Sequence, residues 1–135
     1  MFLEKTEMID EEYNWKGKKI LITEDEEINY LFLERVLSPT NVTIERACNG
    51  REAIDMAVGD SEIDLVLMDI RMPEINGIDA TIEIRKQRPN LPVIAHTCYD
   101  TDLNLSSLPE VKFDGFISKP VNISKMMRLI DKYMK

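Results

Sequence analysis

Residues 64–73 of the chain are DLVLMDIRMP, and this stretch decides which fold the sequence predicts. The four residues at positions 65–68, LVLM, are all apolar, as expected for a short strand that is buried on both faces of a parallel sheet. Asp69 ends the apolar run, so a carboxylate is expected at the carboxyl end of a buried strand.

Short apolar runs and amphipathic stretches alternate on both sides of this strand. Strands are predicted at residues 19–23, 42–47, 65–68, 93–97 and 115–118. Helices are predicted at residues 27–37, after an Asn49-Gly50 turn, at 78–88 and at 123–133, where Asn122 can cap the first turn. The repeated alternation of strand and helix predicts an α/β fold, a parallel sheet with helices on both faces.

Two of the helical segments carry more specific expectations. Within residues 27–37, which Pro39 terminates, helical spacing defines one apolar stripe: Ile28, Leu31, Phe32 and Val36. Residues 101–112 contain weak helix formers and Pro109, so a helix before the fifth strand should be short, broken or frayed.

Length and composition restrict the class of protein. The chain has 135 residues, which fits one domain, expected at residues 15–135 after a flexible acidic segment at residues 1–14. Its 17 basic and 25 acidic residues give a net charge of -8, which argues against a nucleic-acid surface. No apolar run approaches the roughly 18 residues of a membrane span, and residues 1–14 do not resemble a signal peptide. Two cysteines make no disulfide framework, so a reduced cytoplasmic protein is expected.

Polar residues follow four of the predicted strands. Glu24-Asp25, Asp69, Thr97 and Lys119 converge on one edge if the strands are parallel. Three carboxylates repel one another in a poorly solvated pocket and need a cation, for which Mg²⁺ (or Mn²⁺) with oxygen ligands is suited. A lysine and a hydroxyl beside that cation make a phosphate site, where one carboxylate can attack phosphorus.

Four runs carry a family resemblance: ILITEDEE at 20–27, LVLMDIRMPEINGIDA at 65–80, PVIAHT at 92–97 and GFISKP at 115–120. Together they resemble the receiver domain of response regulators in two-component signalling, over residues 15–135. The chain is most similar to receivers attached to hybrid histidine kinases. The resemblance implies a doubly wound, flavodoxin-like sheet of five parallel strands in the order 2-1-3-4-5.

The resemblance also implies a set of metal ligands. Asp69 matches the phosphoacceptor, whose carboxylate is also a ligand of the metal ion. Asp25 and the main-chain carbonyl of Arg71 match direct ligands of Mg²⁺, and Glu24 matches the residue that acts through a water molecule. The acidic pair is Glu-Asp here, where Asp-Asp is commoner in the family; the longer Glu24 should still hold a metal-bound water.

Residues around the phosphoryl group are implied in the same way. Thr97 matches the hydroxyl that moves toward the group, and Lys119 matches its salt-bridge partner, with a cis bond to Pro120. Phe116 matches the switch aromatic, and Gly77 is expected to allow a tight turn before the following helix. His96, which precedes Thr97, is expected to be a structural residue with its hydrogen bonds satisfied.

The resemblance implies a phosphorelay switch and no enzyme beyond assistance to its own phosphorylation and dephosphorylation. Its partners would be a histidine kinase or phosphotransfer domain and a downstream protein. Binding to nucleic acid or to a membrane is not expected. Two alternatives stay open. A Mg²⁺-dependent aspartyl phosphatase needs a second acid two residues after its nucleophile, where this chain has Arg71. A pseudo-receiver, which binds partners without phosphorylation, usually lacks one of the site residues that this chain keeps.

Overall fold

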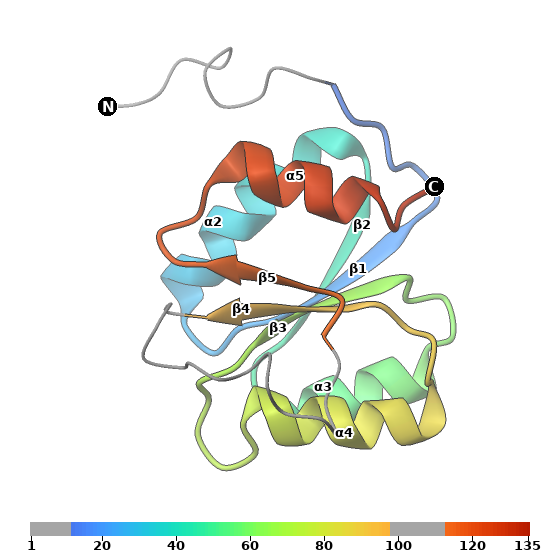
Figure 1. Cartoon of the computed structure of the whole chain (residues 1–135), viewed down its shortest axis with the longest axis vertical. Helices are drawn as coiled ribbons and strands as arrows, with labels where there is room; N and C mark the ends of the chain where they lie inside the picture. Colours follow the sequence, from blue (N-terminus) through green and yellow to red (C-terminus); the bar gives the residue numbers. More distant parts are fainter. Residues whose placement is uncertain (1–11, 98–112) are drawn as a thin grey trace.

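The computed structural model describes residues 12–97 and 113–135 (Figure 1). Its strands form one sheet in the order β2-β1-β3-β4-β5, and all neighbouring pairs are parallel. They are β1 (Lys19–Thr23), β2 (Thr43–Ala47), β3 (Leu65–Asp69), β4 (Val93–Thr97) and β5 (Gly115–Ser118). The predicted α/β fold and the strand order 2-1-3-4-5 are confirmed.

The helices cover both faces of the sheet (Figure 1). They are α2 (Glu27–Leu37), the 3-10 turn η1 (Ser38–Thr40), α3 (Gly50–Gly59), α4 (Gly77–Gln87) and α5 (Ile123–Asp131). The helices α2 and α5 lie on one face, and α3 and α4 lie on the other. The helix expected within residues 101–112 lies outside the described residues. Within the described part of the chain, no helix has the length and hydropathy needed to cross a membrane.

Side chains of the central strands alternate between two apolar clusters. On β1, Ile20 and Ile22 belong to the cluster under α2 and α5, whereas Leu21 belongs to the cluster under α3 and α4. All three side chains are fully buried. Burial on both faces explains why the central strands are apolar at every position, without the alternation of a half-exposed strand.

The helix predicted at residues 27–37 is confirmed, but most of the apolar residues whose spacing predicted it are exposed. Ile28, Leu31 and Phe32 are 79%, 45% and 42% exposed, and only Val36 of that set is buried. The side chains that α2 buries are Leu33, Val36 and Leu37. Two overlapping sets of apolar residues satisfy the helical period in this segment, so periodicity alone does not decide which set faces the sheet.

Asparagine side chains cap three of the helices. Asn49, Asn76 and Asn122 accept hydrogen bonds from the backbone N–H three residues ahead, at 2.8, 2.9 and 3.0 Å. Asn122 was predicted in this role, whereas Asn49 is the cap of α3 and not part of a separate turn. The first turn of α2 differs, because its N-cap residue, Glu26, makes no capping side-chain hydrogen bond.

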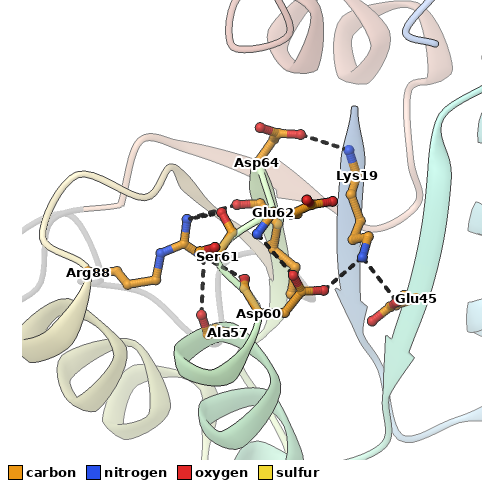
Figure 2. A network of polar contacts seen from close by, with 9 residues as sticks. Lys19, Glu45, Ala57, Asp60, Ser61, Glu62, Asp64 and Arg88 are labelled. Atoms are coloured by element: carbon orange, nitrogen blue, oxygen red, sulfur yellow. Dashed lines mark hydrogen bonds and ion pairs between the residues drawn. The ribbon is translucent and has the colours of Figure 1, made fainter. Parts of the chain in front are cut away.

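A polar network closes the amino edge of the sheet (Figure 2). The Lys19 ammonium pairs with Asp60 at 2.7 Å and with Glu45 at 3.4 Å, and its backbone N–H donates to Asp64. Arg88, just after α4, donates to four backbone carbonyls at 3.0 to 3.3 Å: those of Ala57, Asp60, Ser61 and Ile63. The guanidinium therefore ties the end of α4 to the end of α3 and to the loop before β3.

Trp15 anchors the segment that leads into β1. The residue is 3% exposed, its backbone N–H donates to the carbonyl of Thr40 at 2.7 Å, and its indole Nε1 donates to Asp131 of α5 at 2.8 Å. These contacts join the start of the described chain to its last helix.

Candidate functional site

Three predicted carboxylates come together at the carboxyl edge of the sheet. Glu24 and Asp25 directly follow β1, and Asp69 is the last residue of β3, its neighbour in the sheet. One oxygen of each lies within 4.8 Å of the others. Because the strand order reverses between β1 and β3, the three residues lie at the switch point where parallel sheets bind ligands. Glu24 and Asp69 are buried, and Asp25 is exposed to solvent.

Within the part of the chain that the structure describes, the carboxylate of Glu24 accepts hydrogen bonds at one oxygen and none at the other. Its Oε2 accepts from the backbone N–H of Glu26 at 3.2 Å and from Nδ2 of Asn29 at 3.5 Å. Its buried Oε1 accepts no hydrogen bond from any described residue, although Nζ of Lys119 lies 3.7 Å away. A buried acceptor without a donor is costly, so Glu24 supplies an oxygen where a cation or its bound water fits.

The environment of Asp69 disfavours its ionised form. Burial, followed by the nearby Glu24 carboxylate, raises the pKa of Asp69 to about 8. Lys119 and the backbone N–H of Arg71, which donates to Oδ1 at 3.2 Å, act in the opposite direction. Two carboxylates in a poorly solvated site cannot both hold a full charge without compensation. The donor set therefore suits a hard divalent cation such as Mg²⁺.

Lys119 enters the site from the fifth strand. It follows β5 directly, its side chain is 22% exposed, and its bond to Pro120 is cis, as expected. Its ammonium lies 3.7 Å from Oε1 of Glu24 and supplies part of the positive charge that balances this carboxylate. Lys119 thus has a position from which it can pair with either a carboxylate or an anion bound at Asp69.

Two further predicted site residues are placed less fully. Thr97 is the last residue of β4 and its backbone is in register with Ser118 of β5, but its side chain lies outside the described part. Phe116 on β5 is 44% exposed, and its ring meets the ring of Phe113 edge-on with centroids 5.8 Å apart. The main-chain carbonyl of Arg71 and the roles of these residues stay predictions.

His96 is a neighbour of the site that the sequence did not identify as one. It is in register with Asp69 across β3 and β4, it is 3% exposed, and its Nδ1 lies 3.8 Å from Oε1 of Glu24. Burial and then Lys119 lower the pKa of His96 to about 4, so the ring is neutral. It was expected to be satisfied, but Nε2 has no hydrogen-bond partner among the described residues. The register of two adjacent parallel strands was the signal that could have placed it beside Asp69.

Gly77 has a different role from the one predicted. Its φ is not positive, but a Cβ there would overlap the carbonyl oxygen of Asp69 and come within 2.8 Å of Cα of Ile70. Its N–H donates to the carbonyl of Ile70 at 3.0 Å. The first turn of α4 therefore packs directly on the backbone at the end of β3, and only glycine permits that approach.

The chain is similar in sequence to known proteins over most of its length. The family model for the response regulator receiver domain matches residues 20–131. The osmosensing histidine protein kinase SLN1 of Saccharomyces cerevisiae is 29% identical over 92% of the chain, which spans 11% of that kinase. The polar-differentiation response regulator DivK of Brucella anthropi is 29% identical over 87% of the chain and 96% of that regulator.

Solved structures show the same relationship. The receiver domain of a sensor histidine kinase from Pseudomonas aeruginosa, with a magnesium ion coordinated in its active site cleft, is 26% identical with a TM-score of 0.79, over 87% of this chain and 98% of that one. The receiver domain of the histidine kinase CKI1 from Arabidopsis thaliana, complexed with Mg²⁺ and BeF₃⁻, is 25% identical with a TM-score of 0.77, over 88% and 91%. The chain therefore belongs to the response regulator receiver domain family of two-component signalling.

Proposed function

We propose that the chain is a phosphorelay switch in which Asp69 accepts a phosphoryl group from the phosphohistidine of a kinase or phosphotransfer domain. The observation that carries this proposal is the buried pair of acidic residues Glu24 and Asp69, with Asp25 and Lys119 beside it at the switch point of the sheet. Such an arrangement is unfavourable by itself, and a divalent cation together with a phosphoryl group would balance its charges.

The residues of the chain divide the work of the transfer. The N–H of Arg71 holds Oδ1 of Asp69, which leaves Oδ2 as the nucleophile. A carboxylate oxygen forms the new bond to phosphorus as the bond from phosphorus to the donor imidazole breaks, and that nitrogen then takes up a proton. Bound Mg²⁺ would supply positive charge to the phosphoryl oxygens. After the transfer, the Lys119 ammonium leaves Glu24 and pairs with the new phosphoryl oxygens.

The conformational response is assigned to the strands beside Asp69. Phe116 is partly exposed on β5, two residues before the end of that strand, so an inward rotation of its ring would remove apolar surface from water. Thr97, on the neighbouring β4, is proposed to move toward the phosphoryl group and to open space for that ring. A downstream protein would recognise the changed surface around β5.

The phosphodonor is proposed to dock beside the site through α2. This helix begins two residues after Asp25 and exposes three large apolar side chains at helical spacing: Ile28, Leu31 and Phe32. Exposed apolar residues grouped beside a reactive site are typical of a protein contact. A helical donor such as a histidine phosphotransfer domain offers the complementary apolar face.

Labelling by phosphoramidate in the presence of Mg²⁺ tests the acceptor. The protein should gain one phosphoryl group that base and hydroxylamine remove. Asp69→Asn should abolish the label, and Asp25→Ala should abolish it through loss of the cation. Asp55→Asn, at an exposed position on α3, is the matched control and should be labelled like the wild type.

The same experiment separates the three functions. A switch retains a stable stoichiometric label, a phosphatase turns over the donor, and a pseudo-receiver shows no label. Unchanged labelling of Asp69→Asn in intact-mass measurements would exclude Asp69 as the acceptor.

A further inference from the structure

Arg46, near the end of β2, makes contacts that its place in the strand alone does not require. Its Nε and Nη2 donate to the backbone carbonyl of Glu24 at 3.1 and 3.0 Å. Its Nη1 pairs with Oε1 of Glu27 at 2.7 Å, and its guanidinium carbon lies 4.7 Å from the ring centroid of Tyr30. A planar guanidinium with several donors is the group that can make such a combination.

These contacts hold both ends of the loop that carries Asp25. At the start of the loop, the N–H of Glu24 donates to the carbonyl of Ala47 at 3.0 Å, and the carbonyl of Glu24 accepts from Arg46. Glu27, at the end, is the first residue of α2 and is bound by the third guanidinium nitrogen. Because this helix lacks a side-chain N-cap, its start depends more strongly on the bridge from Arg46.

The bridge acts against the repulsion within the site. Glu24, Asp25 and Asp69 place one oxygen each within 4.8 Å of the others, so those that are ionised repel one another without a cation and favour an outward movement of the loop. The positive charge of a guanidinium without an acidic partner would lower the affinity of a nearby site for a metal ion. Here the carboxylate of Glu27 balances the charge of Arg46, so Arg46 acts by fixing the conformation of the loop that carries Asp25.

We propose that Arg46 is a positioning residue of the cation site, which fixes the loop from Glu24 to Glu27 in its metal-binding conformation before the ion arrives. This inference rests on the proposed function, because it takes Glu24 and Asp25 as the residues that hold the cation. Residues that orient metal ligands from outside the ligand set commonly change metal affinity by about 10 to 100-fold when they are replaced.

Arg88 provides a matched control at the opposite edge of the sheet. It too is a half-buried arginine whose guanidinium donates to backbone carbonyls, and it has four such partners (Figure 2). Loss of either guanidinium should lower the urea midpoint of unfolding. If Arg46 were merely structural, both variants would leave the affinity for Mg²⁺ unchanged.

The experiment compares wild type, Arg46→Gln, Arg46→Lys and Arg88→Gln. Calorimetry gives the dissociation constant for Mg²⁺, and labelling by phosphoramidate over a range of Mg²⁺ gives the half-saturating concentration and the limiting rate. For Arg46→Gln we expect both Mg²⁺ constants to rise about tenfold, with the limiting rate unchanged. Arg46→Lys keeps the charge but not the planar fork, so it should share most of that loss, and Arg88→Gln should match the wild type.

Amide exchange of the cation-free protein gives an independent readout. Residues 24–27 should exchange faster in Arg46→Gln than in wild type, and at the wild-type rate in Arg88→Gln. The inference is overturned if both Arg46 variants bind Mg²⁺ with the wild-type dissociation constant and half-saturating concentration. It is also overturned if Arg46→Gln lowers the limiting rate of labelling and leaves the half-saturating Mg²⁺ concentration unchanged. Either result would leave the proposed function intact. If the wild type itself neither binds Mg²⁺ nor becomes labelled, the proposed function fails first.

Discussion

Raising the pH from 6.5 to 8 should destabilise the cation-free protein, and Asp69→Asn should abolish this effect. The folded-state pKa of Asp69 is raised to about 8 from 3.8, by burial and then by Glu24. Between these values the folded state keeps a proton that the unfolded state has lost. Stability therefore falls as the pH rises, by about 1.4 kcal/mol per pH unit for one proton.

His96 limits the range in which this loss is visible. Its folded-state pKa is lowered to about 4 from 6.5, by burial and then by Lys119, so between these values the unfolded state binds the extra proton. Stability then rises with pH, and the contributions of His96 and Asp69 oppose each other below pH 6.5. Above that pH the contribution of Asp69 dominates. Asp69 is half ionised in the folded state at pH 8, and His96 is half protonated in the unfolded state at pH 6.5, so the net loss over 1.5 pH units is about 1.3 kcal/mol.

Urea unfolding in EDTA at pH 6.5, 7.2 and 8 measures this difference. The wild type should lose about 1.3 kcal/mol of unfolding free energy over this range, and Asp69→Asn should show no such loss. Saturating Mg²⁺ should remove the loss in the wild type, because the ion binds the ionised form of the site in the folded state. A wild-type protein whose stability is constant or rises from pH 6.5 to 8 would refute the argument that Asp69 keeps its proton.

Three other perturbations have definite expected outcomes. Lys119→Met should leave Mg²⁺ affinity unchanged or raise it, since a cation that competes at Glu24 is removed; calorimetry that shows weaker binding would contradict this. Gly77→Ala should cost about 1 to 3 kcal/mol in urea unfolding, because the added Cβ overlaps the backbone of Asp69; an unchanged midpoint would count against the close packing. Ile28→Asp should slow phosphotransfer from a protein phosphohistidine but not from phosphoramidate, while the exposed position keeps stability within about 0.5 kcal/mol; equal slowing with both donors would argue against docking at α2.

The fold could be predicted from the sequence because the central strands have a strong local signal. Apolar runs such as residues 65–68 indicate burial on both faces, and the spacing of the elements leaves little choice but a parallel sheet. The acidic residues of the site follow strand ends, so their convergence on one edge could also be inferred, as the positions of Glu24 and Asp69 confirm.

What the sequence did not reveal depends on contacts between distant elements. The buried face of α2 could not be assigned from the sequence, because both Phe32 and Leu33 fit a helical period and only packing on the sheet chooses between them. The contact of Arg46 with the carbonyl of Glu24 joins β2 to the loop after β1, and no local pattern marks it. The need for glycine at position 77 is likewise steric, and follows from how closely α4 approaches β3.

Trp15 gives the chain a built-in spectroscopic reporter. It is the only tryptophan in the sequence, its indole is buried and hydrogen-bonded to Asp131 of α5, and it precedes β1 at the amino edge of the sheet. Glu24 follows β1 at the opposite edge, so binding of an ion there places no new charge against the indole. Its emission therefore follows the docking of α5 and the unfolding of the whole domain, and a change in emission on phosphorylation would mean that the response extends through the entire thickness of the fold.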